Sequence, residues 1–237
     1  MRIIDKFKAK SDNLKGAEPI TIAFFGDSVT QGCFNLVMPN ENAIDPTFDY
    51  ESPYHAKLKK IFNLLFPRVP INIINAGISG GNAAEGVERI ERDGLKFSPD
   101  LCIVCFGLND SAGGDLELYK KSMREIFTRL QEKGVEVIHL TPNMMCDRAD
   151  YPSEHPWIKD IVLRTMELQT SGKLKTFLEA GKEISKELNI PICDCYSKWE
   201  KLAQSGVNVS SLLYVNHPVP DMHWLFAFSL AEIIFEM

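Results

Sequence analysis

The chain has 237 residues, of which 45% are hydrophobic and 24% charged, and its formal net charge is −6. This length and composition suit a soluble α/β domain whose core needs neither disulfides nor metal ions. The net negative charge gives no indication that the protein binds nucleic acid or an anionic membrane surface. The sequence shows no signal-peptide pattern and no apolar run long enough to span a bilayer, so the expected compartment is the cytoplasm.

The cysteine spacing predicts core packing rather than a metal site. Cys102 and Cys105 have the spacing of redox and zinc motifs, but they fall in an apolar, strand-like run. Positions three apart on a strand face opposite sides, so one metal ion could not easily use both thiols. Cys193 and Cys195 alternate in another apolar run, and no second pair stands at zinc-site distance. We therefore expect buried cysteines, with no metal and no cofactor.

Short apolar runs and amphipathic helices alternate along the chain. Residues 1–18 are polar and predict a short helix or arm. Apolar runs predict strands at residues 20–25, 71–75, 101–106, 135–140 and 190–194. Ser52 and Pro53 predict a helix start, with serine as the N-cap and proline at the first helical position. Apolar residues at helical spacing predict further helices near residues 83–90, 115–132 and 172–188, and at the C-terminal end.

This order predicts one domain over residues 1–237, a three-layer α/β/α sandwich around a five-stranded parallel sheet, as in flavodoxin-like folds. Two segments do not fit the alternation. Residues 33–51 predict a long loop, and residues 143–170 predict a loop with irregular helices that shape a pocket. Substrate specificity, or a lid, would reside in these two segments.

Polar or glycine-rich residues follow three of the predicted strands. Ser28 follows the first strand, Gly80 the second and Asn109 the third. The carboxyl ends of parallel strands share one edge of the sheet, which is where such folds bind ligands. Acyl transfer requires a nucleophile, such as a serine, and several hydrogen-bond donors to the oxyanion that forms. Three such donors could come from the main-chain N–H groups of Ser28 and Gly80 and from the Asn109 amide. Taken singly, these residues could instead be turn or helix-cap residues.

Taken together, these motifs resemble the SGNH/GDSL hydrolase family. Residues 26–28 (Gly-Asp-Ser), 75–80 (Asn-Ala-Gly-Ile-Ser-Gly) and 107–110 (Gly-Leu-Asn-Asp) match its first three blocks in order. The resemblance implies that Ser28 is the nucleophile and that Gly80 and Asn109 complete the oxyanion hole.

The last block departs from the family pattern, which is usually Asp-x-x-His-Pro. Aligning His217 and Pro218 makes His217 the general base but leaves Tyr214 at the acid position. The alternative base is His223, with Asp221 as its acid, although that spacing is one residue short and no proline follows.

The acid normally orients the imidazole and stabilises the imidazolium. A main-chain carbonyl, Asp194 or Asp221 could take this role, and the sequence does not choose among them.

The resemblance implies a metal-independent serine ester hydrolase that forms an acyl-enzyme and acts on short acyl esters, such as O-acetylated carbohydrates. A lysophospholipase or thioesterase is the alternative enzyme, and it would need a longer apolar groove. The absent acid also leaves open a catalytically weak ligand-binding member of the fold. The expected partner is a small-molecule ester, without nucleic acid or a membrane span; homo-oligomer formation stays open.

Overall fold

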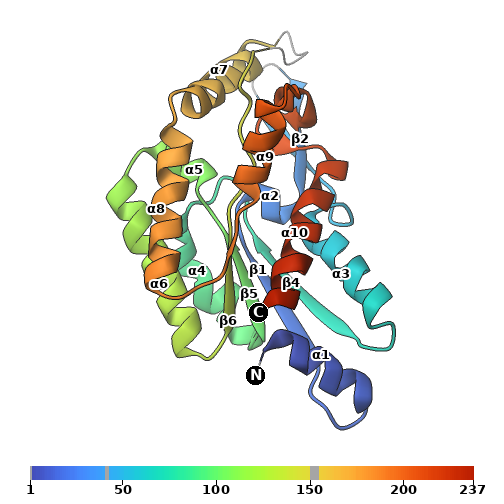
Figure 1. The fold of residues 1–237 in the computed structure, drawn as a ribbon. Helices are drawn as coiled ribbons and strands as arrows, with labels where there is room; N and C mark the ends of the chain where they lie inside the picture. Colours follow the sequence, from blue (N-terminus) through green and yellow to red (C-terminus); the bar gives the residue numbers. More distant parts are fainter. Residues whose placement is uncertain (1, 41–42, 150–154) are drawn as a thin grey trace.

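A five-stranded parallel sheet forms the middle layer of the protein, in a computed structural model that describes residues 2–40, 43–149 and 155–237 (Figure 1). The strand order is β4-β1-β5-β6-β7, and every neighbouring pair is parallel. The strands are β1 (Ile20–Gly26), β4 (Ile71–Gly77), β5 (Leu101–Cys105), β6 (Glu136–Leu140) and β7 (Ile192–Cys193). The predicted fold class is confirmed.

Helices cover both faces of this sheet (Figure 1). One face carries α1 (Ile3–Asp12), α3 (Tyr54–Leu65), α9 (Cys195–Gln204) and α10 (His223–Glu236). The other carries α4 (Ala83–Asp93), α6 (Leu116–Glu132) and α8 (Lys173–Glu187). Side chains of β1 alternate between the two cores, Ile22 and Phe24 facing one and Ala23 and Phe25 the other. This two-sided burial explains why the strand is apolar throughout.

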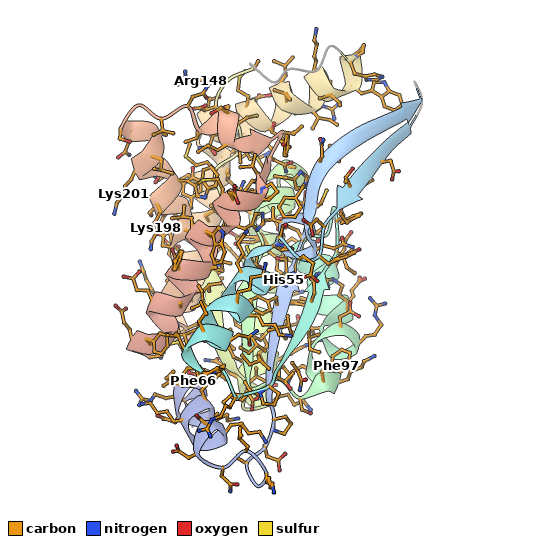
Figure 2. All side chains as sticks on the ribbon, turned by 90° about the vertical axis from the view of Figure 1, so that its right-hand side faces the viewer. His55, Phe66, Phe97, Arg148, Lys198 and Lys201 are labelled. Carbon is orange, nitrogen blue, oxygen red and sulfur yellow. The ribbon has the colours of Figure 1, made fainter. Side chains whose placement is uncertain are left out.

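Residues 33–51 do not form the long loop that we predicted. They contain an antiparallel hairpin of β2 (Cys33–Asn40) and β3 (Ala43–Phe48), which Figure 2 shows projecting away from the sheet. Pro39, Pro46 and several polar residues hide the strand pattern, because proline is rare inside paired strands. Pro46 is paired with Leu36, and the ladder has register shifts between Cys33 and Asn35 and between Val37 and Asn40.

Residues 143–170 are more regular than predicted. Residues 156–170 form one helix, α7 (Pro156–Thr170), whereas residues 143–149 are irregular and residues 150–154 lie outside the described residues. Only three positions of α7 are buried, at spacings of four and three residues: Ile158, Val162 and Thr165. So narrow an apolar stripe gives a weak helical signal in the sequence.

Smaller differences occur at element ends. α3 begins at Tyr54 with Pro53 in the N-cap position, because the predicted cap, Ser52, donates its hydroxyl to Asp49 instead. His55, which Figure 2 labels, is only 5% exposed and packs against Phe24. No helix in the described parts of the chain is long and apolar enough to cross a membrane.

Candidate active site

Ser28 is the first residue of a short helix, α2 (Ser28–Gln31), which follows β1 directly. Asp27 is its N-cap and accepts a hydrogen bond from the Val29 N–H at 3.0 Å. The turn is tight: a Cβ at Gly26 would lie 2.6 Å from the Cys105 carbonyl oxygen, so glycine is required there. Ser28 therefore stands at the carboxyl end of the sheet, 5% exposed.

His217 contacts Ser28 directly. Its Nε2 lies 2.8 Å from the Ser28 Oγ, although 189 positions separate the two residues in sequence. A short antiparallel ribbon holds the histidine: β8 (Leu213–Tyr214) pairs with β9 (His217–Pro218), with Tyr214 opposite His217. The structure thus brings together the serine and the histidine that we selected from the sequence.

The buried His217 ring is neutral at pH 7. Burial lowers its pKa from 6.5 to about 4, and the Tyr214 main-chain carbonyl, which raises the pKa, only partly offsets this. When Nε2 accepts the Ser28 hydroxyl hydrogen, the ring proton must be on Nδ1. Nδ1 does not meet the geometric criteria for a hydrogen bond with any described residue. The Tyr214 carbonyl oxygen lies close enough to affect the pKa of the ring, but its alignment with Nδ1 is poor.

Asn143 stabilises the loop that carries His217, and the sequence did not reveal this. Its fully buried amide donates to the main-chain oxygens of Asn216, at 2.8 Å, and Met144, at 2.7 Å. One feature of the sequence could have indicated Asn143, namely its position just beyond β6. Ser28 and Asn109 were selected because they are polar residues at the ends of strands, and Asn143 is another.

Gly80 and Asn109 lie in neighbouring loops at the same edge. Gly80 has a φ of +76°, a conformation that favours glycine, and its N–H donates to no described residue. Asn109, in α5 (Leu108–Gly113), donates its side-chain amide to the Gly81 carbonyl at 2.9 Å. The third predicted motif is therefore hydrogen-bonded to the residue that directly follows the second motif.

Two buried carboxyl groups support these loops. Asp110 accepts hydrogen bonds from the N–H groups of Ala83 and Gly107, at 2.9 and 3.0 Å. Burial raises the pKa of Asp110 to about 6 and that of Asp27, which also feels the Asp110 charge, to about 7. Their hydrogen bonds to main-chain N–H groups indicate a supporting role.

The alternative base lies elsewhere. His223 Nδ1 accepts the Tyr54 N–H at 3.1 Å, at the start of α3, and burial lowers the pKa of His223 to about 3. A histidine in this position caps a helix and fills the core.

Neither alternative acid reaches His217. Asp194 is the N-cap of α9, where it also accepts from Thr141 at 3.0 Å and Lys182 at 2.9 Å. Asp221 is exposed and forms no hydrogen bond with His217 among the described residues.

The chain belongs to the GDSL-like Lipase/Acylhydrolase family, whose sequence model matches residues 24–225. It is therefore a carboxylic ester hydrolase. No curated protein matches the sequence.

Solved structures share the fold at low identity. Axe2, an acetylxylan esterase from Geobacillus stearothermophilus, superposes with a TM-score of 0.67 at 19% identity, covering 91% of this chain and 94% of its own. A two-domain esterase, CEX, described as active on acetylated mannans, gives a TM-score of 0.66 at 20% identity. The match to CEX covers 98% of this chain but only 52% of CEX.

Proposed function

We propose that the protein is a serine esterase in which Ser28 is the nucleophile and His217 the general base. The observation that carries this proposal is the 2.8 Å contact between Ser28 Oγ and His217 Nε2. That distance allows direct proton transfer, and the depressed pKa of His217 keeps its ring able to accept a proton at neutral pH.

The reaction follows from this geometry. His217 Nε2 takes the Ser28 hydroxyl proton while Oγ attacks the ester carbonyl carbon. The N–H groups of Ser28 and Gly80 and the Asn109 amide receive the oxyanion. When the C–O bond to the alcohol breaks, the imidazolium returns its proton to the leaving alkoxide. A water molecule, deprotonated by His217, then attacks the acyl-enzyme and releases the acid and Ser28.

Among the residues that the structure describes, no carboxylate is hydrogen-bonded to His217. In Axe2, replacements of a serine, an aspartate and a histidine are described as catalytic mutants, and the aspartate there precedes the histidine by three positions. Tyr214 has the equivalent spacing here. We assign the orienting role to the Tyr214 main-chain carbonyl, because it acts on the His217 ring and favours the protonated form.

The substrate class that we propose is a short acyl ester, an O-acetylated carbohydrate in particular. The support is the similarity in fold to esterases named for acetylxylan and acetylated mannans. No feature of the described residues favours a lysophospholipase or thioesterase.

Hydrolysis of p-nitrophenyl acetate, butyrate and octanoate, and acetate release from acetylated xylo-oligosaccharides, test the proposal in wild type and three variants. Ser28→Ala and His217→Ala should each lose activity by at least about 10³-fold. His223→Ala is the matched control and should keep its kcat, because His223 does not contact Ser28. The acetate ester should be the best p-nitrophenyl substrate.

Loss in His223→Ala but not in His217→Ala would refute the assignment of the base. A wild type no more active than Ser28→Ala on any of these esters would refute the catalytic proposal in favour of a ligand-binding protein.

A further inference from the structure

A buried arginine lies beneath the two loops that carry Ser28 and Gly80. Arg89, from α4, is only 7% exposed. Its Nη2 donates to the main-chain oxygen of Gly26 and its Nη1 to that of Ala76, both at 2.7 Å. One guanidinium group therefore joins the ends of two neighbouring strands.

Both carbonyls stand where the strands give way to the site. Gly26 ends β1 two residues before Ser28, and Ala76 lies in β4 four residues before Gly80. The last register pair of β1 and β4 is Gly26 opposite Gly77. Beyond it the Ile78 N–H donates to the Gly26 oxygen at 3.1 Å, and Gln31 of α2 accepts from the Ser79 N–H at 2.6 Å and the Asn75 amide at 3.0 Å. The fork of Arg89 adds one hydrogen bond to each chain from the side of α4, at the point where the two chains separate into the loops.

The surroundings of Arg89 fix its orientation. The guanidinium carbon lies 4.4 Å from the ring centre of Phe25 and 5.9 Å from that of Phe106. Asp93 reaches Nη1 at 3.4 Å, and burial lowers the pKa of Arg89. A buried charge adds little net stability even when it is well paired, because an apolar side chain of similar volume commonly serves as well. The planar fork, in contrast, has a geometry that no apolar side chain reproduces.

We propose that Arg89 is a positioning residue for ester hydrolysis, which sets the separation between the Ser28 hydroxyl and the Gly80 N–H. This inference rests on the proposed function. Arg89 does not touch the substrate; it acts through the main chain at Gly26 and Ala76. A displacement of about 1 Å between nucleophile and oxyanion donor can lower the rate of the chemical step by about 10²-fold.

The experiment compares Arg89→Lys, Arg89→Met and Arg89→Ala with Arg92→Met, using p-nitrophenyl acetate. Arg92 is a matched control on the same helix, because its exposed guanidinium pairs with Asp93 and with no other residue in the described part of the chain. Circular dichroism gives the folded fraction, and a fluorophosphonate probe, followed by mass spectrometry, reports the reactivity of Ser28. Guanidinium chloride at low millimolar concentration is then added to Arg89→Ala.

Arg89→Met should lower kcat by about 10²-fold and leave KM within about threefold. The kcat of Arg89→Lys should lie between those of wild type and Arg89→Met, because the lysine ammonium keeps the charge but lacks the planar fork. Guanidinium should restore part of the kcat of Arg89→Ala. It should restore no activity to Ser28→Ala, which serves as the control. Arg92→Met should match wild type.

Folded Met and Ala variants that keep the wild-type kcat would overturn the positioning role. So would a loss of activity that only follows the unfolded fraction and does not respond to guanidinium. A wild type that is inactive and unlabelled at Ser28 would refute the proposed function and this role with it, whereas active wild type with active Arg89 variants refutes this role alone.

Discussion

At the scale of single residues, the proposed mechanism depends on a neutral histidine, and no described carboxylate is hydrogen-bonded to its ring. A triad carboxylate stabilises the imidazolium that forms when serine gives up its proton. His217 has the Tyr214 carbonyl instead, and burial favours the neutral ring. We therefore expect a base that stays unprotonated over a wide pH range but stabilises its own charged form less than a complete triad does.

The pH dependence of kcat/KM follows from this. The base must be neutral, so activity is lost as pH falls through the pKa of the free enzyme's histidine, about 4 for His217 rather than 6.5. We expect kcat/KM for p-nitrophenyl acetate to be constant from about pH 5.5 to 7 and to halve near pH 4. The assay should be read within seconds of a pH jump, with the folded fraction followed by tryptophan fluorescence. A midpoint near 6.5 would show that the working base is solvated.

His223 should affect stability and not catalysis. His223→Ala removes the acceptor of the Tyr54 N–H at the start of α3, together with a buried ring in contact with Phe34 and Phe226. We expect a loss of about 2–4 kcal/mol in the free energy of unfolding. Urea unfolding measures it, and an unchanged midpoint would contradict the structural role.

At the scale of elements, the sequence was informative where local chemistry decides the structure. β1, β5 and the turn at Ser28 were predictable because buried parallel strands are apolar and end in recognisable turns. The contact of His217 with Ser28 was expected only through the family resemblance, because no local pattern brings residues 189 positions apart together.

Other features depend on tertiary contacts that no local pattern records. The strands of the β2–β3 hairpin contain proline and polar residues, and their pairing with each other makes them strands. The role of Asn143 lies in its bond to Asn216, 73 positions away, and that of Arg89 in two main-chain oxygens. The sequence position of such a polar group does not identify the distant main-chain group that it binds.

The start of α9 allows a test of what Asp194 does. Its carboxylate accepts from the Ser197 N–H and hydroxyl, at 3.1 and 2.7 Å, and pairs with Lys182, and these contacts hold its pKa at about 2 despite burial. Asp194→Ala should lower the free energy of unfolding by about 1–2 kcal/mol, a value reduced for partial exposure, and leave kcat unchanged. Urea unfolding and the p-nitrophenyl acetate assay measure the two quantities. A large loss of kcat in folded Asp194→Ala would make Asp194 part of the catalytic machinery after all.

At the scale of the whole molecule, buried titratable groups set how stability varies with pH. Burial lowers the pKa of four histidines: His55, His139 and His217 to about 4, and His223 to about 3. Each binds a proton more readily in the unfolded chain, where its pKa is 6.5, so its contribution is present above pH 6.5 and lost as pH falls through 4. Asp27 and Asp110 have the opposite effect on stability. Their raised pKa values stabilise the folded state at low pH, and this stabilisation is lost as pH rises through about 6 to 7.

The balance predicts acid sensitivity. Near pH 5 the unfolded chain binds about four more protons at the histidines and the folded chain about two more at the aspartates, a net difference of about two. Stability should therefore fall by about 3 kcal/mol for each pH unit of acidification near pH 5, and it should level off only above about pH 7.5. Urea unfolding between pH 4.5 and 8 measures this slope. His139→Gln, on β6 where the histidine is hydrogen-bonded to Ser185, should reduce the slope near pH 5 by about 1.4 kcal/mol per pH unit, because it removes one of the four protons. A slope that His139→Gln leaves unchanged would mean that the buried histidines do not control acid unfolding.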